Sequence, residues 1–325
     1  MRTLSSITAL VYLLLVALCG ALFPCAVTAQ APVAAQVPEQ DQAVIRTSVS
    51  LVMMDATVKT KSGQLLSDLK KSDFEVREDG VLQDVQVFSR DELPLNVALV
   101  LDLSDSIEPF LGPLREAANS ALAALKPDDE VALFTFSTEA QLRVPFTTDK
   151  SKVAEQINSF KVGGATNIND GIFVPAKYLL TAPNKGRRVI ILISDDVATY
   201  AGGQGTHDII TELIATDAVL YNLKIPGYNP PGTMLAASYE KGLVNIRKVM
   251  EQTGGEVFDV QSVANLDAAF RALIQRIKTR YTVGYYTKAS AAEGKQHKLD
   301  LRLTPSFGKK GKDYLVLSKT GFYVH

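Results

Sequence analysis

Between about residues 94 and 279, short continuous apolar runs alternate with segments whose apolar residues recur every three or four positions. The continuous runs are typical of strands buried on both faces of a parallel sheet, and the periodic segments are typical of amphipathic helices. The expected strands are 97–101, 131–136, 189–193, 219–223 and 256–260. The expected helices are 111–125, 150–160, 170–180, 206–216, 243–253 and 266–278. Strands that alternate with helices predict an α/β fold with a doubly wound, mostly parallel sheet over residues 94–279.

The segments on either side, residues 44–93 and 280–325, alternate polar and apolar positions instead. Asp79-Gly80 lies between two such runs and predicts a hairpin turn. The expected strands are 49–60, 74–78, 85–88, 280–286 and 297–303, with one or two more in 314–317 and 322–324. We expect residues 289–295 to form a long hairpin turn between the strands on either side of them. Neither flank has enough strands to bury a core alone, so the two are predicted to form one small composite β domain.

The first 43 residues lack this patterning and are interpreted as export and linker sequence. Residues 1–29 combine a positive start, an uncharged stretch from Ile7 to Val27 and a small-residue cleavage site ending at Ala29, as in a bacterial export signal. Residues 30–43 are rich in Pro, Ala and Gln and are predicted to be a flexible linker. We therefore expect an exported protein, periplasmic or secreted. If the signal is not cleaved, its apolar stretch is long enough to anchor the protein in a membrane.

Composition excludes several classes of function. Lys plus Arg number 34 against 35 for Asp plus Glu, so the net charge of −1 offers no field to hold a nucleic acid. With three histidines and two cysteines, neither a tetrahedral zinc site nor a disulfide scaffold is expected, and any metal is expected to be held by oxygen ligands. His207, His297 and His325 are not spaced as metal ligands and are expected at the surface.

The candidate chemistry begins at Asp102-Leu-Ser104-Asp-Ser106, directly after the first expected parallel strand. Ligands of open α/β sheets bind beyond the carboxyl ends of the strands, so a site is expected here. One carboxylate and two hydroxyls at alternate positions offer three hard oxygens, which suit Mg²⁺ or Mn²⁺. By itself the pattern is equally compatible with serines that cap a helix.

Two later segments favour the metal interpretation. Gly163-Gly-Ala-Thr166-Asn is a loop of small residues with one hydroxyl, and the buried strand 189–193 is followed by Ser194-Asp195-Asp196. With these three motifs in this order, the region 94–279 resembles the von Willebrand factor type A domain, whose metal-ion-dependent adhesion site combines them. The resemblance implies that Ser104, Ser106 and Thr166 bind the cation through hydroxyl oxygens, while Asp102 and Asp195 act directly or through water. The implied metal ligands are Asp102, Ser104, Ser106, Thr166 and Asp195, and the implied cation is Mg²⁺, Mn²⁺ or Ca²⁺.

The resemblance also implies how such a site binds a partner. Few protein charges ligate the cation directly, so it stays electrophilic enough to take an Asp or Glu side chain of a protein ligand at an open position. This sequence departs from the commonest family pattern at Asp105 and Asp196, where many members have glycine. The two carboxylates could tighten cation binding or repel an acidic partner, but the simplest expectation is that both side chains point to solvent.

The flanks carry a second resemblance. Residues 67–80 and 83–88, together with Tyr281 to Tyr285 and Gly321-Phe-Tyr, are similar to secreted bacterial proteins in which β strands wrap a von Willebrand factor type A domain. Together the resemblances imply an exported, non-enzymatic adhesion or binding module. One alternative is a structural envelope or assembly component whose metal site is empty. A metal-dependent hydrolase is the other, although it needs a general base and a second ligand set that the sequence does not offer.

Overall fold

The computed structural model of the chain describes residues 50–90, 93–183, 186–200, 202–227, 242–290, 294–307 and 314–324. The expected export signal at 1–29 and the expected linker at 30–43 lie outside these ranges. None of the described helices is both long enough and apolar enough to cross a membrane.

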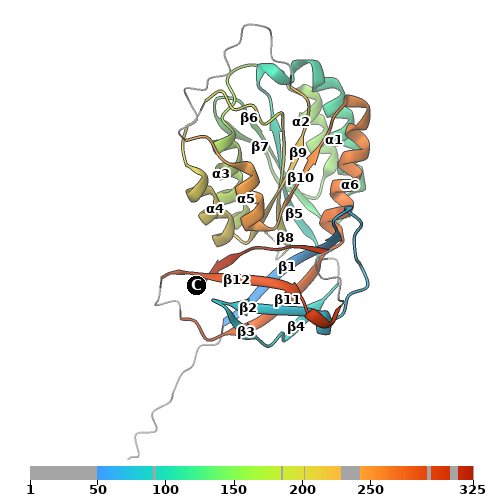
Figure 1. Cartoon of the computed structure of the whole chain (residues 1–325). Helices are drawn as coiled ribbons and strands as arrows, with labels where there is room; N and C mark the ends of the chain where they lie inside the picture. Colours follow the sequence, from blue (N-terminus) through green and yellow to red (C-terminus); the bar gives the residue numbers. More distant parts are fainter. Residues whose placement is uncertain are drawn as a thin grey trace, which may run out of the picture. The chain divides into compact units, whose positions relative to one another are not determined.

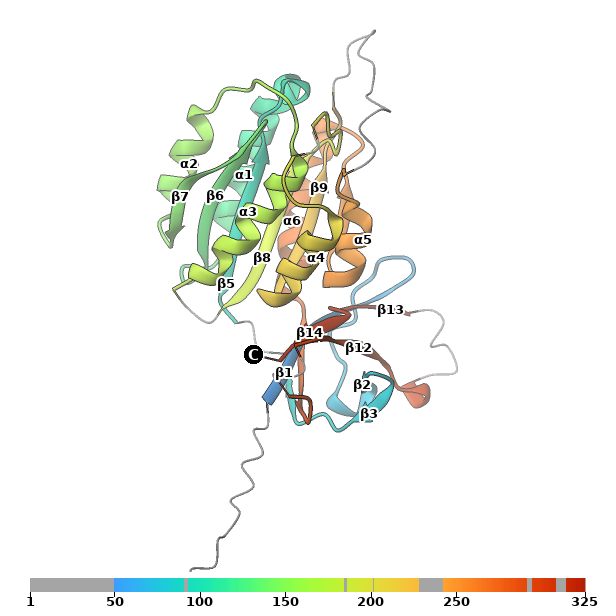
Figure 2. The same ribbon diagram turned by 90° about the vertical axis from the view of Figure 1, so that its left-hand side faces the viewer.

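A six-stranded sheet forms the centre of the α/β domain (Figures 1 and 2). Its strands, in spatial order, are β10 (Glu256–Asp259), β9 (Ala218–Lys224), β8 (Arg187–Ser194), β5 (Leu95–Asp102), β6 (Glu130–Phe136) and β7 (Ala140–Thr147). All neighbouring pairs are parallel except β6 and β7. Every residue of β5 is buried, as the continuous apolar run predicts. The predicted doubly wound, mostly parallel sheet is therefore confirmed.

Helices cover both faces of this sheet (Figure 2). The helices are α1 (Leu111–Ala124), α2 (Lys150–Ser159), α3 (Ile168–Tyr178), α4 (Thr206–Ala215), α5 (Ile246–Thr253) and α6 (Leu266–Lys278). The apolar stripes of α1, α2 and α6 share one core with the sheet, and those of α3, α4 and α5 share the other. Local chemistry sets the ends of these helices. The Asp149 carboxylate accepts hydrogen bonds from two amides of the first turn of α2, and Gly254 ends α5 in the left-handed region at φ 79°.

Two four-stranded antiparallel sheets form the composite β domain, which we call the β sandwich. The first contains β13 (Tyr314–Leu317), β1 (Ser50–Thr60), β11 (Tyr281–Thr287) and β4 (Val87–Ser89), in that order. The second contains β14 (Gly321–Tyr323), β12 (Gln296–Leu303), β2 (Phe74–Glu78) and β3 (Val81–Gln83). Alternate residues of both sheets, such as Val52 and Met54 on β1 and Leu299 on β12, form one shared core. Because each sheet takes strands from both flanks, the predicted composite domain is confirmed.

The turn between β2 and β3 is the expected two-residue hairpin. Asp79 and Gly80 have φ values of 49° and 86°, which is the left-handed pair that a type I′ turn requires. The other expected hairpin is wrong. Strands β11 and β12 belong to different sheets, so they do not pair with each other as the two strands of a hairpin would.

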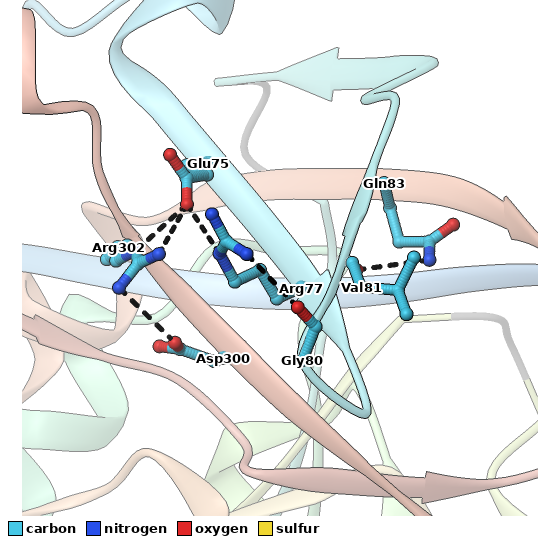
Figure 3. Close-up of polar contacts among 7 residues, drawn as sticks. All are labelled: Glu75, Arg77, Gly80, Val81, Gln83, Asp300 and Arg302. Carbon is cyan, nitrogen blue, oxygen red and sulfur yellow. Dashed lines mark hydrogen bonds and ion pairs between the residues drawn. The ribbon is translucent and has the colours of Figure 1, made fainter.

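The solvent face of the second sheet carries a charged network (Figure 3). Glu75 Oε1 accepts hydrogen bonds from Arg77 Nε at 2.7 Å and from Arg302 Nη2 at 2.5 Å, and Arg302 lies 3.8 Å from Asp300. The two guanidinium groups hold the pKa of Glu75 below its ordinary value. The opposite face of β2 and β12 is apolar apart from Glu78 and His297, so this network marks the polar half of the alternation that predicted these strands.

Two further features differ from the sequence expectations. Strand β7 was not expected, since Gln, Arg and Pro interrupt its apolar positions and only Val144 is buried. His297, expected at the surface, is 3% exposed because its position on β12 faces the sandwich core. Its imidazole lies against the ring of Phe322, with 5.3 Å between the ring centroids.

The β sandwich contacts the α/β domain at the edge where the parallel strands begin. Arg187, the first residue of β8, places its Nε 3.2 Å from Asp55 Oδ2 on β1 and donates from Nη2 to Thr282 Oγ1 on β11 at 3.0 Å. Glu256, the first residue of β10, forms ion pairs with Lys59 of β1 and Arg276 of α6. The other edge of the sheet, where the strands end, is left for a site.

Candidate metal site

Asp102 ends β5 and is completely buried. Its Oδ1 accepts a hydrogen bond from Ser104 N at 2.9 Å, and its Oδ2 accepts one from Ser194 Oγ at 2.7 Å. Burial, and to a smaller extent the nearby charge of Asp195, raises the pKa of the Asp102 carboxyl to about 7, although its hydrogen bonds oppose this shift. The structure thus holds Asp102 in a fixed orientation at an energetic cost that a cation would reduce.

The two predicted serines lie beside each other just after Asp102. Ser104 Oγ and Ser106 Oγ are 3.2 Å apart. Ser104 precedes a short 3-10 helix, Asp105–Phe110, but its side chain makes no capping hydrogen bond to that helix. The alternative in which Ser104 merely caps a helix is therefore wrong, and its buried hydroxyl faces a second hydroxyl instead.

The Thr166 loop is joined to the other two loops by backbone hydrogen bonds. Gly163 N donates to Leu103 O at 2.7 Å, which ties this loop to the Asp102 loop. Thr199 N donates to Thr166 O at 3.1 Å, and Thr166 N donates to Thr199 Oγ1 at 2.8 Å, which tie it to the segment after β8. Thr166 is 2% exposed. The sequence prediction that these loops meet at one edge of the sheet agrees with this placement.

Asp195 follows the last residue of β8. Its Oδ1 accepts a hydrogen bond from Val197 N at 3.0 Å, whereas its Oδ2 is buried and has no hydrogen-bond partner among the described residues. Gly227 packs so closely that a Cβ at that position would lie 2.0 Å from Asp195 Oδ2. An unpaired buried carboxylate oxygen is costly unless a charge or donor compensates it. The donor set of carboxylates and hydroxyls therefore fits a hard divalent cation.

The two extra carboxylates behave differently from each other. Asp105 is exposed, as expected. Asp196 does not point to solvent, because both of its carboxylate oxygens accept hydrogen bonds from Asn222 Nδ2 on β9, at 2.9 and 2.8 Å. Burial raises the pKa of Asp196 to about 6, even though Asn222 hydrogen bonds and the charge of Lys224 oppose the shift. Asp196 also has a φ of 61°, the left-handed region that favours glycine.

Sequence comparison identifies the domain. A family model described as von Willebrand factor type A domain matches residues 97–198. The chain carries a von Willebrand factor type A domain. A comparison of the sequence with curated proteins finds no match.

Several solved structures are similar to parts of this chain. An aerotolerance-related membrane protein from Bacteroides fragilis is 18% identical with a TM-score of 0.44, and the match covers 56% of this chain and 98% of that one. BatB from Bacteroides thetaiotaomicron is 19% identical with a TM-score of 0.42, covering 56% and 97%. A von Willebrand factor type A protein from Catenulispora acidiphila is 12% identical with a TM-score of 0.44, covering 76% and 72%.

Three residues of this von Willebrand factor type A domain were not predicted to have a role at the site. Ser194 orients Asp102, Asn222 holds Asp196, and Gly227 leaves room for Asp195. Ser194 could have been found from its place directly before Asp195. The other two come from a strand and a loop that the sequence motif does not include, so only the fold reveals them.

Proposed function

We propose that the chain is an exported, non-enzymatic binding module whose von Willebrand factor type A domain holds a divalent cation at the carboxyl edge of its sheet. Through this cation, Mg²⁺, Mn²⁺ or Ca²⁺, it binds an Asp or Glu side chain of a protein partner. The observation that carries the proposal is the buried Asp195 Oδ2, which has no hydrogen-bond partner among the described residues and lies at the same edge of the sheet as the buried Asp102 carboxyl.

The energetics of the two carboxyls support a cation here. Both are removed from water, and the charge of Asp195 contributes part of the rise in the Asp102 pKa. A bound divalent cation would reverse this effect because it interacts favourably with both carboxylates. Binding of the cation would then stabilise the folded state by an amount that grows with the logarithm of its concentration over its dissociation constant.

The remaining proposed ligands explain why such a cation would stay available to a partner. Ser104, Ser106 and Thr166 would supply neutral hydroxyl oxygens. These ligands would occupy part of the coordination sphere without neutralising the ion, and one position would stay open. A cation that retains net positive charge favours an external carboxylate as its last ligand. The polar loops around it would then contribute contacts that select one partner over another.

The first experiment is a titration of Mg²⁺, Mn²⁺ and Ca²⁺ into the metal-free protein by calorimetry. The wild-type protein should bind one ion and Asp102→Ala should bind none, because the substitution removes a buried carboxylate of the proposed site. Asp105→Asn is the matched control, since it removes an exposed carboxylate from the same loop and should retain binding. If the wild type binds no ion at millimolar concentration, the structural alternative with an empty site is favoured instead.

A second experiment tests the partner. Immobilised protein is incubated with envelope extract in Mg²⁺ or in chelator, and Thr166→Ala is compared with wild type. We expect capture that requires Mg²⁺ and falls in Thr166→Ala, while the melting temperature of that variant stays close to wild type. Equal capture in Mg²⁺ and in chelator contradicts a cation-bridged partner. Turnover in a broad hydrolase screen, lost in Asp102→Ala, favours the enzyme alternative.

A further inference from the structure

A second set of metal-binding side chains lies in the β sandwich, on strands remote from the carboxyl ends of the parallel strands. Glu78, Asp79 and His297 place one ligand atom each within 4.8 Å of one another. His297 Nδ1 is 2.9 Å from Asp79 Oδ2 and 3.7 Å from Glu78 Oε1. This is the one group of three or more His, Cys, Asp or Glu residues found with such spacing among the described residues.

The β-sheet register and the hairpin turn fix these three residues. Glu78 ends β2 opposite Leu299 of β12, two positions beyond His297. Asp79 occupies the left-handed first position of the turn. Asp79 N donates to Lys298 O at 2.9 Å, and Lys298 N donates to Asp79 Oδ1 at 2.9 Å. With Oδ1 committed to the backbone, Oδ2 faces His297, so the ligand atoms are positioned by backbone contacts that exist without any ion.

Two of the three polar residues of this cluster are buried in the otherwise apolar core of the β sandwich. Glu78 is 8% exposed and His297 is 3% exposed. Glu78 Oε1 accepts one hydrogen bond, from the buried Thr287 Oγ1 at 2.8 Å. The carboxylates of Glu78 at the end of β2 and of Asp79 in the hairpin turn therefore lie beside the single imidazole of His297.

A buried tyrosine beside the cluster is the second observation that points to a ligand. Tyr285 is completely buried on β11, and its Oη has no hydrogen-bond partner of acceptable geometry among the described residues. The Tyr285 hydroxyl interacts with the Glu78 side chain, although not with the geometry of a well-formed hydrogen bond, so Oη lies beside the cluster. Buried hydroxyls in native proteins usually form well-aligned hydrogen bonds, so the incomplete pairing of Tyr285 Oη among the described residues marks the cluster as a place where a further polar group could bind.

We propose that Glu78, Asp79 and His297 form a second divalent-cation site, selective for a borderline ion such as Zn²⁺. Imidazole with carboxylates suits Zn²⁺ better than Mg²⁺, which prefers oxygen ligands alone. Zn²⁺ binds imidazole nitrogen and carboxylate oxygen at about 2.0–2.2 Å. His297 Nδ1 lies 2.9 Å from Asp79 Oδ2 and 3.7 Å from Glu78 Oε1, so the nitrogen and either oxygen are close enough to bind the same ion. The 48% exposure of the Asp79 side chain gives the ion a route from solvent.

Such an ion would tie the β2–β3 turn to β12. These two elements come from opposite ends of the described chain, so the ion would act as a cross-link between the two flanks of the β sandwich. It would stabilise the folded sandwich without contacting the proposed site at the edge of the parallel sheet. The sequence expectation that only oxygen ligands were available did not anticipate this arrangement, because residues 78, 79 and 297 have no motif spacing.

Calorimetric titration of Zn²⁺ into tag-free, chelator-treated full-length protein tests the site. The wild type should bind one Zn²⁺ at the sandwich. Asp79→Asn should weaken that binding by about tenfold or more, because asparagine keeps the left-handed turn and the contact with Lys298 N but removes the charge. His297→Gln should abolish it. Asp102→Ala is the matched control and should leave Zn²⁺ binding at the sandwich unchanged.

Melting temperatures separate the two proposals from each other. In Asp79→Asn, Zn²⁺ should no longer raise the melting temperature, whereas Mg²⁺ should raise it as in the wild type. In Asp102→Ala the pattern should be reversed. The proposal is overturned if wild-type protein binds no Zn²⁺, or if Asp79→Asn and a folded His297→Gln bind it as tightly as wild type. In that case the His297–Asp79 contact is simply a hydrogen bond that closes the turn.

Discussion

The two ends of the parallel sheet treat charge in opposite ways. Where the strands begin, Arg187 is neutralised by Asp55, and Glu256 by Lys59 and Arg276, across the contact with the β sandwich. Where the strands end, three buried or half-buried carboxyls of Asp102, Asp195 and Asp196 gather with hydroxyl and amide groups as their neighbours. Both ends are built from the same strands. The difference therefore lies in what packs against each end, because β1 and α6 supply opposite charges where the strands begin, whereas loops border the end where the strands finish.

This contrast separates charges that are paired with opposite charges of the chain from carboxyls that lie close to one another. Burying an ion pair costs desolvation energy, but the attraction between its two charges offsets that cost. Such a pair therefore does not need an external ligand to compensate its charges. Like charges left together raise one another's pKa and destabilise the fold until something else binds. The stability contributed by the carboxyl end of the sheet should therefore depend on pH and on the concentration of divalent cations.

The largest expected effect is a pH dependence of the chelated protein. Burial holds the Asp102 pKa at about 7 against an ordinary value of 3.8, and the Asp196 pKa at about 6. The folded protein therefore binds protons more tightly than the unfolded chain, and each pKa unit is worth about 1.4 kcal/mol. Stability contributed by these protons should be complete below about pH 4 and be lost as the pH rises to about 7.

Urea unfolding in chelator at about pH 5 and about pH 7.5 measures this effect. The free energy of unfolding should be lower at the higher pH by on the order of several kcal/mol, as the two pKa shifts imply. Asp102→Asn carries no titrating charge, so its stability should change less between the two pH values. If the wild type is equally stable at both, the carboxyls at this end are not forced together as described.

Breaking the Arg187–Asp55 ion pair, at the end where the strands begin, should have the next largest effect on the free energy of unfolding. Arg187→Met leaves Asp55 without its buried partner, and removal of one member of a buried ion pair costs about 3 kcal/mol. The double variant Arg187→Met with Asp55→Asn should recover part of that loss, because no charge is then left unpaired. The free energy of unfolding from urea titration decides between them. Equal losses in the single and double variants mean that the pair contributes only packing.

A close approach at the carboxyl end should matter for the cation more than for folding. In Gly227→Ala the added Cβ would lie 2.0 Å from Asp195 Oδ2, so the carboxylate must move. We expect Mg²⁺ affinity to fall by about tenfold, or ~1.4 kcal/mol, in a calorimetric titration. Gly112→Ala on α1 is the control, since a Cβ there meets nothing within 4 Å. Unchanged affinity in Gly227→Ala excludes Asp195 as a ligand.

The smallest expected effect concerns the backbone at Asp196. Asp196→Ala and Asp196→Gly both lose the contact with Asn222 and differ only in the Cβ. At a φ of 61° that Cβ costs about 1 kcal/mol, so the alanine variant should be the less stable of the two. Thermal unfolding of the pair compares them directly. Identical stabilities mean that this residue does not adopt the left-handed conformation in solution.

Much of the fold follows from the sequence because burial on both faces leaves a strong pattern. The parallel strands could be predicted from continuous apolar runs, and β5 is buried along its whole length. Strand β7 could not, because it lies at the sheet edge and buries only Val144. Alternation also predicted β11 and β12 correctly as strands, but it gives no information on pairing, so their assignment to separate sheets was missed.

The candidate site divides in the same way. Asp102 and Asp195 could be placed together because both directly follow buried strands of one parallel sheet. The contact between Asp196 and Asn222 could not be predicted, since an asparagine inside an apolar strand shows no partner in the sequence. His297 was misplaced for a related reason. A single polar residue at an inward position becomes recognisable only when the strands that face it are known.

The pairing of the first described strand with distant ones has a consequence for the order of folding. Thr282 Oγ1 on β11 bonds to Asp55 on β1 across 227 positions of the chain. During synthesis β1 therefore emerges long before its partners, and its apolar face has nothing to pair with. The βα units of the central sheet make nearby contacts and can fold in the meantime, since closing short loops costs less entropy. The sandwich must close last, and until then β1 is an exposed strand edge of the kind that promotes aggregation.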